Sequence, residues 1–210
     1  MPVGTLVKMG LQELNALLAT RRSTKSIAEA PVRAKELEDV LGAVFRVAPG
    51  RSRAYGSAHA RYPVTATLIA GNVSGLASGS YRVAPSGNVH DVVPGEYRDI
   101  VARATIDGSW IAASPALLVL SADVGAENAE FNWQSDGRGE RFIAMEVGLI
   151  AQTVSLATAA LDLGTVLIAG IHADAARHLP ESVVPRHEEL IAVMPLGRAS
   201  ARTVNTSTER

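Results

Sequence analysis

Apolar residues recur at helical spacing in two segments near the start of the chain. The first runs from Leu11 to Leu18 and predicts a short amphipathic helix that ends where the sequence Thr-Arg-Arg-Ser begins. The second is predicted to begin at Pro31, because proline is favoured at the first helical position, and to stop near 48–50. Its apolar stripe consists of Leu37, Val40, Leu41 and Val44.

Apolar and β-branched runs bounded by turn residues predict strands farther along. Segments 80–84 and 89–93 flank a Pro-Ser-Gly-Asn turn and predict an antiparallel hairpin. Short helices are predicted at 173–179 and from the spacing of Tyr97, Ile100, Val101 and Ala104. The other predicted strands are 64–70, 114–122, 165–171 and 189–197.

The longest predicted helix runs from about Arg141 to Leu163 and is apolar nearly all round, so it must be covered on every side. Gly164 is placed to end it. Its length approaches that of a membrane span, but Glu146 and Gln152 within it favour a buried helix without a membrane. We expect these two side chains to hydrogen-bond across a packed interface or to a ligand.

The irregular mixture of helices and strands predicts an α+β fold, with a central, mainly antiparallel sheet flanked by helices. No linker is long enough to divide the chain, so we expect one domain over 1–200. Residues 201–210 form a polar tail, either disordered or laid on another surface as an exchanged arm.

Composition narrows the function classes. Lys and Arg total 20 against 21 Asp and Glu, which disfavours nucleic-acid binding. Cysteine is absent, so thiolate chemistry is excluded, and the five histidines form no zinc motif. No signal-peptide pattern stands at the amino terminus, so we expect a cytoplasmic location.

The most distinctive local pattern is Thr-Arg-Arg-Ser-Thr-Lys-Ser-Ile at 20–27. Guanidinium groups bind phosphate bidentately and hydroxyls add donors, so the segment could hold a phosphate dianion. The alternative is that these charges complement the dipole of the preceding helix and are solvated. The phosphate-binding candidates are Arg21, Arg22, Ser23 and Lys25.

Six segments, taken in order, resemble the nitroreductase superfamily of flavin enzymes, and the similarity spans Leu14 to Arg198. Segment 20–27 resembles the family's phosphate-binding signature. Segment 53–63, Arg-Ala-Tyr-Gly-Ser-Ala-His-Ala-Arg-Tyr-Pro, resembles a loop of the azoline-oxidising, azole-forming branch, which acts on ribosomally made peptides. The other similar segments are 77–83, the long helix from Arg138, 166–171 and Met-Pro-Leu-Gly-Arg at 194–198.

The resemblance implies a homodimer with the long helix at its interface and noncovalent FMN at each subunit boundary. Arg21, Arg22, Ser23 and Lys25 would bind the FMN phosphate, ribityl chain and ring edge, with Arg198 closing on the phosphate. The backbone of Ala169 and Gly170 would face flavin N5. Ser57, Ala58 and His59 would lie near the isoalloxazine ring.

Two departures from the family pattern bear on catalysis. His59 stands where the family loop usually has glycine, and it either shapes the pocket or acts as an acid or base. Gln134 and Ser135 stand where the branch often has a Lys-Tyr pair, so no catalytic base is assigned. Asp136 or His59 could replace that pair.

Three functions follow from the resemblance. The first is an FMN-dependent dehydrogenase or oxidase that acts on a peptide or peptide-derived natural product and passes electrons to dioxygen. The second is an NAD(P)H-dependent nitro or quinone reductase. The third is a non-catalytic partner protein that keeps the fold and serves a modifying enzyme.

Overall fold

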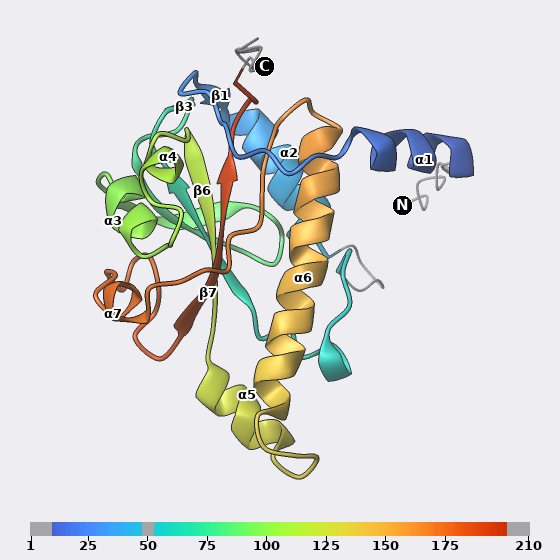
Figure 1. Cartoon of the computed structure of the whole chain (residues 1–210), viewed down its shortest axis with the longest axis vertical. Helices are drawn as coiled ribbons and strands as arrows, with labels where there is room; N and C mark the ends of the chain where they lie inside the picture. The colour runs from blue at the N-terminus through green and yellow to red at the C-terminus, as the bar shows by residue number, and fades with distance from the viewer. Residues whose placement is uncertain (1–9, 48–52, 201–210) are drawn as a thin grey trace, which may run out of the picture.

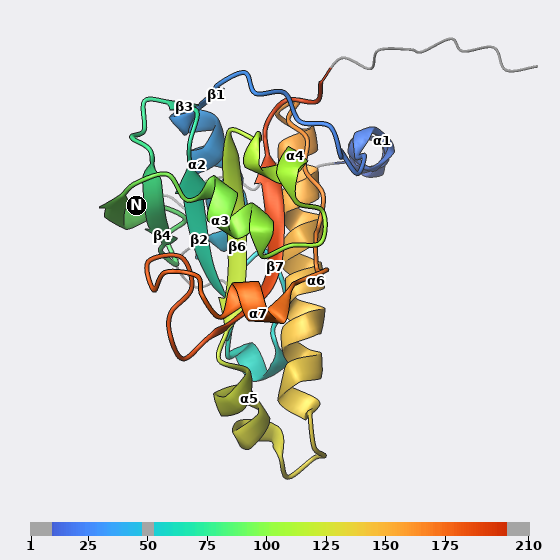
Figure 2. The same cartoon turned by 60° about the vertical axis from the view of Figure 1, so that its left-hand side comes forward.

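The computed structural model describes residues 10–47 and 53–200. Its centre is a five-stranded sheet of order β5-β4-β2-β6-β7 in which every neighbouring pair is antiparallel (Figures 1 and 2). A second sheet pairs two short strands, β1 and β3, in parallel. The strands are β1 Val32–Arg33, β2 Thr65–Ala70, β3 Val73–Ser74, β4 Gly79–Val83, β5 Val89–Pro94, β6 Ala116–Ala122 and β7 Glu189–Leu196.

Helices cover both faces of the sheet, so the α+β prediction is confirmed (Figure 2). The helices α2 and α6 pack on one face and α3, α4 and α7 on the other. The α-helices are α1 Leu11–Thr20, α2 Ala34–Phe45, α3 Arg98–Arg103, α4 Ser109–Ala112, α5 Val124–Phe131, α6 Arg138–Ala159 and α7 Ala173–Ala176, and a 3-10 turn, η1, spans Ala58–Ala60.

The core explains why β6 is an unbroken apolar run. Alternate residues of a strand point to opposite faces. Leu118 and Leu120 join the core beneath α2 and α6, whereas Leu117 and Val119 join the core beneath α3 and α4. All seven β6 residues are buried, as expected for a central strand covered on both faces.

The long helix α6 packs on the sheet along one face only. Its buried side chains recur every three or four residues, whereas Ala144, Met145, Gly148, Leu149 and Gln152 form an exposed strip, called the α6 outer face below. The single chain therefore does not cover the helix on every side, and the burial of its remaining face in a dimer stays a prediction. By length and composition α6 could cross a membrane, but it packs as a core helix does.

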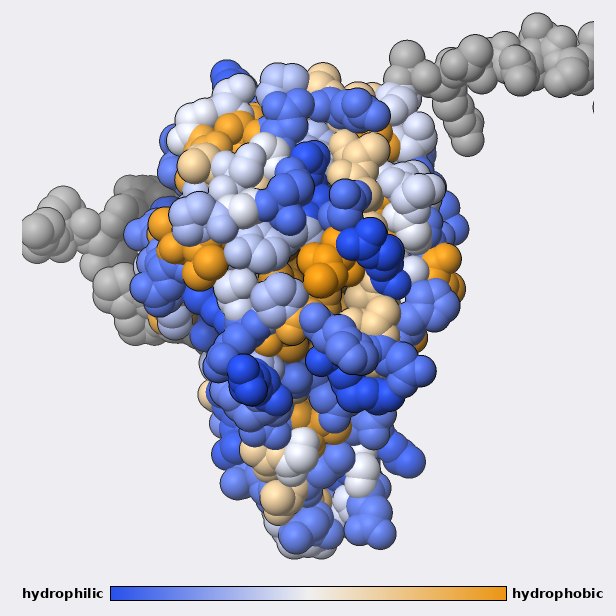
Figure 3. All heavy atoms as spheres, turned by 90° about the vertical axis from the view of Figure 1, so that its left-hand side faces the viewer, coloured by the Kyte–Doolittle hydropathy of each residue, from blue (hydrophilic) through white to orange (hydrophobic). Residues whose placement is uncertain are grey.

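Other surfaces are more polar. The face that carries α3 and α7 is mainly hydrophilic, and its apolar patches are small and separate (Figure 3). The helix α1 lies apart from the body, to which the following segment joins it, and none of its residues is buried (Figures 1 and 2).

Three boundaries differ from the sequence prediction. Segment 165–171 is not a strand but makes single bridges from Thr165 to Ser23, Ile168 to Val193 and Ile171 to Thr105, because it changes partner as it descends past β7. The second helix begins at Ala34, since Val32 and Arg33 pair with β3. The long helix begins at Arg138 and ends at Ala159, and residues 160–162 form a turn.

Helices α4 and α5 were not predicted from the sequence. The predicted end of the second helix near 48–50 and the predicted tail or arm at 201–210 lie outside the described residues.

Candidate functional site

The basic segment 21–28 lies along the end of α6 and the end of β7 (Figure 1). The amide of Thr24 donates to the carbonyl of Thr165 over 2.9 Å, and the amide of Ala28 donates to the carbonyl of Arg198 over 2.8 Å. The fold therefore brings together the two groups that were predicted to bind one phosphate, Arg21 to Lys25 and Arg198.

Two glycines permit this close approach. A Cβ atom at Gly164 would lie 2.7 Å from Thr24 Cγ2, and one at Gly197 would lie 2.4 Å from Ile27 Cγ2. Both distances are shorter than real Cβ contacts. The amide of Gly164 also donates to the carbonyl of Gly197 over 2.6 Å, which closes the three segments into one unit.

The cations of this segment are accessible. Among the described residues, Arg21, Arg22 and Lys25 form no ion pair with a carboxylate. Arg22 Nη1 donates to the carbonyls of Ala19, over 2.5 Å, and Arg21, over 3.0 Å. Arg22 thus also caps α1, as the alternative interpretation expected, and its other guanidinium donors remain available.

A cavity of about 240 Å³ opens beside these cations. Arg22 and Thr24 form one wall, and Ser155, Thr158 and Asp162, from the end of α6 and the turn after it, form another. The lining itself holds one cation, Arg22, and one carboxylate, Asp162, and the other two cations of segment 21–25 lie outside it. The Arg22 guanidinium and the neighbouring hydroxyls are groups that can bind an anion.

Thr165 adds an independent sign of a ligand. Thr165 is 2% exposed, and its hydroxyl has no hydrogen-bond partner among the described residues. A buried hydroxyl without a partner is costly unless a ligand or water satisfies it. Since Thr165 pairs with Ser23 and Thr24, the unpaired donor stands where a phosphate would fit.

Arg198 is held by a carboxylate. Its Nη2 atom lies 2.7 Å from Glu36 Oε1, which also accepts from Arg33 Nη2 over 2.9 Å. Hydrogen bonds from Arg33, aided by the charge of Arg198, lower the pKa of Glu36 to about 2. The ion pair fixes the Arg198 guanidinium against α2 and leaves it partly exposed, while its backbone carbonyl accepts from Ala28 at the end of the basic segment.

We expect Glu36→Gln to lower the free energy of unfolding by roughly 1.5–3 kcal/mol at pH 7, because charge-assisted hydrogen bonds are lost. Since the folded-state pKa of Glu36 is depressed, its stabilisation is present above the ordinary carboxyl pKa of 4.5 and is lost as the pH falls through about 2. Urea unfolding at several pH values should show that the difference in free energy of unfolding between wild type and variant becomes smaller as the pH falls over that interval. A constant difference would contradict the assignment.

Ala169 and Gly170 follow in the segment that descends past β7. Gly164 bridges Gly197, beside the basic segment, and Ile168 bridges Val193, four residues farther along both segments. Four extended residues span about 13 Å, so Ala169 and Gly170 begin at about that distance from Gly164. The Gly170 carbonyl accepts from Ile106, whereas the amides of Ala169 and Gly170 have no acceptor among the described residues. Their N–H groups are thus free donors beside the exposed side chains of Ile106 and Leu167.

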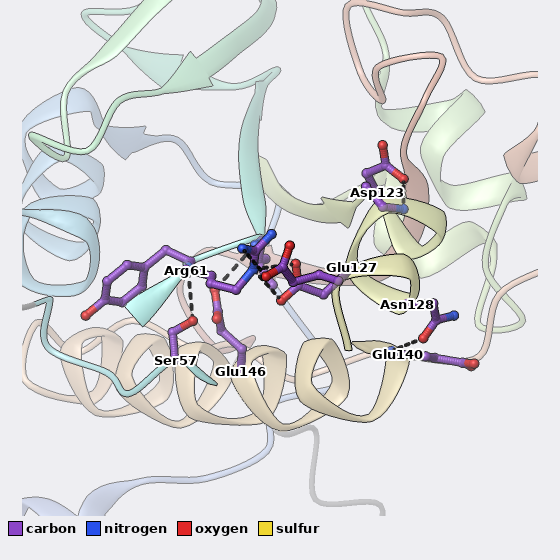
Figure 4. Close-up of polar contacts among 11 residues, drawn as sticks. Ser57, Arg61, Asp123, Glu127, Asn128, Glu140 and Glu146 are labelled. Atoms are coloured by element: carbon purple, nitrogen blue, oxygen red, sulfur yellow. Dashed lines mark hydrogen bonds and ion pairs between the residues drawn. The ribbon is translucent and has the colours of Figure 1, made fainter. Parts of the chain in front are cut away.

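The loop with Ser57, Ala58 and His59 lies elsewhere, against the middle of α6. Three of its non-glycine residues, His59, Ala60 and Tyr62, have positive φ. Such strain persists when surrounding contacts fix it. Ser57 Oγ accepts from the amide of Tyr62 over 2.8 Å, and Arg61 pairs with the buried Glu127 over 3.1 Å (Figure 4).

The two residues predicted as alternative catalytic acids or bases, His59 and Asp136, lie in different parts of the fold. The ring of His59 packs 5.4 Å from that of Phe131, at the exposed surface, which supports a shaping role. Gln134, Ser135 and Asp136 lie in the turn between α5 and α6 (Figure 1). That turn is at the opposite end of α6 from the basic segment, so within one chain Asp136 is not brought to the phosphate site.

The sequence missed the role of Glu146 in this loop. Its carboxyl accepts from the amide of Val64 over 3.3 Å and lines a cavity together with Ser57, so it has partners within the same chain (Figure 4). Burial raises the pKa of Glu146. An acidic residue within an apolar helix was the signal, but its partner could not be read from the sequence.

The two halves of the candidate site are far apart in one chain. Glu146 contacts the Ser57 loop, and Thr158 lines the cavity beside Arg22, so they are separated by about 18 Å along the axis of α6. Within the described residues no group of three potential ligands could hold a metal ion.

Comparison with known proteins gives the family. The model of the Nitroreductase family matches residues 18–198. A Methanocaldococcus jannaschii protein that is provisionally named a nitroreductase, MJ1384, is 28% identical over 188 residues, which are 89% of this chain and 91% of the relative.

Solved structures share the fold. A provisionally named nitroreductase from Anabaena variabilis matches with a TM-score of 0.75 and 21% identity, over 90% of this chain but 39% of the other. The E. coli microcin synthetase McbBCD complex with truncated pro-MccB17 bound gives 0.70 and 18%, over 96% and 77%. The Vibrio harveyi NADPH:FMN oxidoreductase complexed with NAD+ gives 0.60 and 17%, over 89% and 69%. The family match over residues 18–198, joined to this shared fold, shows that the chain belongs to the nitroreductase family and is an oxidoreductase.

Proposed function

We propose that the protein is an FMN-dependent oxidoreductase. The observation that carries the proposal is the accessible cluster of Arg21, Arg22, Ser23 and Lys25, which is fixed beside Arg198 and the unpaired hydroxyl of Thr165. These groups would hold the FMN phosphate, and the free amides of Ala169 and Gly170, about 13 Å away, would donate to the ring. Bound FMN would supply two-electron hydride transfer.

We propose further that the protein acts as a homodimer. The Ser57 loop lies too far along α6 to reach an FMN whose phosphate is at Arg22 of the same chain, so a second copy would supply that loop. The α6 outer face supports this, since Met145 and Leu149 are 63% and 48% exposed. The separate helix α1, with Leu11 and Leu18 exposed, offers a second apolar contact.

For the substrate we propose a peptide or peptide-derived natural product that is dehydrogenated, with dioxygen as the final electron acceptor. The support is the likeness to a chain of the microcin synthetase complex and the Ser57 loop sequence. A partner modifying enzyme is part of this proposal. We also propose a cytoplasmic location.

The names of the Vibrio and Methanocaldococcus proteins favour the alternative, an NAD(P)H-dependent nitro or quinone reductase. Anaerobic stopped-flow spectroscopy separates the two directions. Slow flavin bleaching by NADPH together with rapid bleaching by a thiazoline-containing peptide supports the dehydrogenase. Rapid bleaching by NADPH alone supports the reductase.

The departure at Gln134 and Ser135 favours a third candidate, a non-catalytic partner protein with the same fold. Native mass spectrometry and the visible spectrum of the purified protein test it together. A dimer with one FMN per chain, bleached by a substrate, would exclude this candidate. A colourless monomer that does not take up added FMN would overturn all the flavin proposals.

Replacing Arg22 with Ala is expected to weaken FMN binding by about 1.5–3 kcal/mol, which is roughly 10- to 150-fold, because a charge-assisted phosphate contact is lost. Isothermal titration of the apoprotein with FMN measures it. Arg103→Ala, an exposed arginine on α3, is the matched control and should leave affinity unchanged. If Arg22 only caps α1, its replacement will change thermal stability slightly and FMN affinity not at all.

A further inference from the structure

A second cavity, of about 230 Å³, opens on the α6 outer face next to the Ser57 loop. Most of its lining is small or apolar, and the two side chains in it that can exchange a proton are Ser57 and Glu146. The other lining residues are Gly56, Ala58, Phe142, Met145 and Leu149. In the proposed function Ser57 lies beside the flavin ring, so this cavity would border the place where substrate reacts.

The side chains of Ser57 and Glu146 line the same cavity. Ser57 Oγ accepts from the amide of Tyr62 over 2.8 Å, which leaves its hydroxyl proton available to the Glu146 carboxyl (Figure 4). A hydroxyl oxygen has two lone pairs, so one remains to accept a proton from a molecule in the cavity. The hydroxyl therefore stands between the cavity and a carboxyl that is itself only 2% exposed.

The surroundings of Glu146 keep this carboxyl available. Its Oε1 atom is fixed by the amide of Val64, 3.3 Å away. Three ionisable groups face it from other elements, namely Arg53 and Tyr55 ahead of the loop and Glu127 from α5. Arg53 Nη1 donates to the hydroxyl of Tyr55 over 2.6 Å and, among the described residues, forms no ion pair with Glu146. Glu127 is an acid like Glu146, and its charge is paired with Arg61. Burial is the largest influence and makes its carboxylate a stronger base than an exposed one.

We propose that Ser57 and Glu146 form the proton relay of the oxidoreductase, and that Glu146 takes the place of the base missing at Gln134 and Ser135. The proposal rests on the proposed function. In dehydrogenation, the substrate proton would pass to Ser57 Oγ as the Ser57 proton passes to Glu146, and bound FMN would supply the hydride acceptor, with dioxygen as the final two-electron acceptor. In reduction, the same pair would return a proton from Glu146 through Ser57 to the substrate. The strained loop would hold Ser57 beside Glu146 for this transfer.

The decisive variants are Glu146→Gln, which keeps the shape but cannot take a proton, and Ser57→Ala, which breaks the connection. Glu140→Gln is the matched control, an exposed acid on the same helix. Two probes cover both directions, a thiazoline-containing dipeptide under dioxygen and p-benzoquinone with NADPH. We expect Glu146→Gln to bind FMN as wild type does and to lose roughly 10²- to 10⁴-fold in kcat. Ser57→Ala should lose a similar factor, and Glu140→Gln should lose nothing.

A second measurement needs no turnover. Because the folded-state pKa of Glu146 is raised, its stabilising contribution is full below the ordinary carboxyl pKa and is lost as the pH rises through the raised value. The melting temperature of the apoprotein should therefore fall less between pH 5 and pH 8 in Glu146→Gln than in wild type. Infrared difference spectra should show a protonated carboxyl band that disappears in the variant.

Wild-type kcat in Glu146→Gln, or loss of FMN by this variant, would overturn the relay, the second result because it assigns Glu146 a structural role. Failure of the wild-type protein to bind FMN, or to turn over either probe, is a failure of the proposed function and would remove the relay with it. Turnover by wild type combined with full activity of both variants contradicts the relay alone.

Discussion

Placing lysines at Met145 and Leu149 together is expected to convert the protein to monomers that no longer retain FMN. The two side chains lie one turn apart on the α6 outer face and are 63% and 48% exposed, so the single chain tolerates the change. In the proposed dimer both become buried, and burying an unpaired ammonium group costs several kcal/mol for each charge. FMN should be lost as well, because in the proposed dimer the Ser57 loop beside it would belong to the second copy.

Size-exclusion chromatography with light scattering gives the mass, and visible absorbance gives the retained flavin. Val92→Lys is the matched control, since Val92 is 48% exposed on β5, away from α6, and should leave both readouts unchanged. A double-lysine variant that remains dimeric and yellow would show that the subunits meet elsewhere, and would contradict the placement of the Ser57 loop beside the flavin of the second copy.

The sheet was predictable because its strands carry their own burial pattern. Segment 114–122 is apolar at every position, and the structure places it as β6 between two layers of helices. The hairpin at 80–84 and 89–93 was fixed by local turn chemistry, and β4 pairs with β5 as expected. In such segments local preference and tertiary packing agree.

Segment 165–171 shows where this reasoning fails. Its composition is that of a buried strand, but its residues bond in turn to Ser23, Val193 and Thr105, which lie on different elements. The partner of each residue is decided by the path of the whole chain. It cannot be predicted from the spacing of apolar residues in the sequence. The isolated bridges keep the amides of Ala169 and Gly170 free, and a continuous ladder would have consumed them.

In the candidate site, too, residues within one short segment could be predicted from the sequence, whereas contacts between distant segments could not. Arg21 to Lys25 stood out because three cations and two hydroxyls in five residues have few structural uses, and the structure keeps them accessible. Glu146 could be flagged but not placed, since its contacts with Ser57 and Val64 cross 89 and 82 positions of sequence. The binding of Glu36 to Arg198, across 162 positions, was not visible at all.

Gly139→Ala is expected to be strongly destabilising, although alanine is the better helix former. Gly139 lies in the first turn of α6, and a Cβ atom there would be 2.2 Å from the backbone carbon of Glu127 and 2.4 Å from the amide nitrogen of Asn128. Backbone atoms cannot turn away as a side chain would, so α5 must move off α6. Overpacking of this kind typically costs about 1–3 kcal/mol, and a rigid backbone contact places it at the upper end or beyond.

The displacement should also reach the loop at the cavity. Glu127 on α5 holds Arg61, and Arg61 follows the strained residues His59 and Ala60, so moving α5 pulls on the loop that presents Ser57. Chemical denaturation should show the loss of stability, and near-ultraviolet circular dichroism should show a change around Phe131 and Phe142, whose rings lie 4.8 Å apart across the two helices. Gly125→Ala, in α5 with only an ordinary contact at 3.5 Å, is the control and should gain up to about 1 kcal/mol from helix propensity. Equal gains in both variants would mean that α5 does not approach α6 as closely as the structure has it, and that the Ser57 loop is held by Glu146 alone.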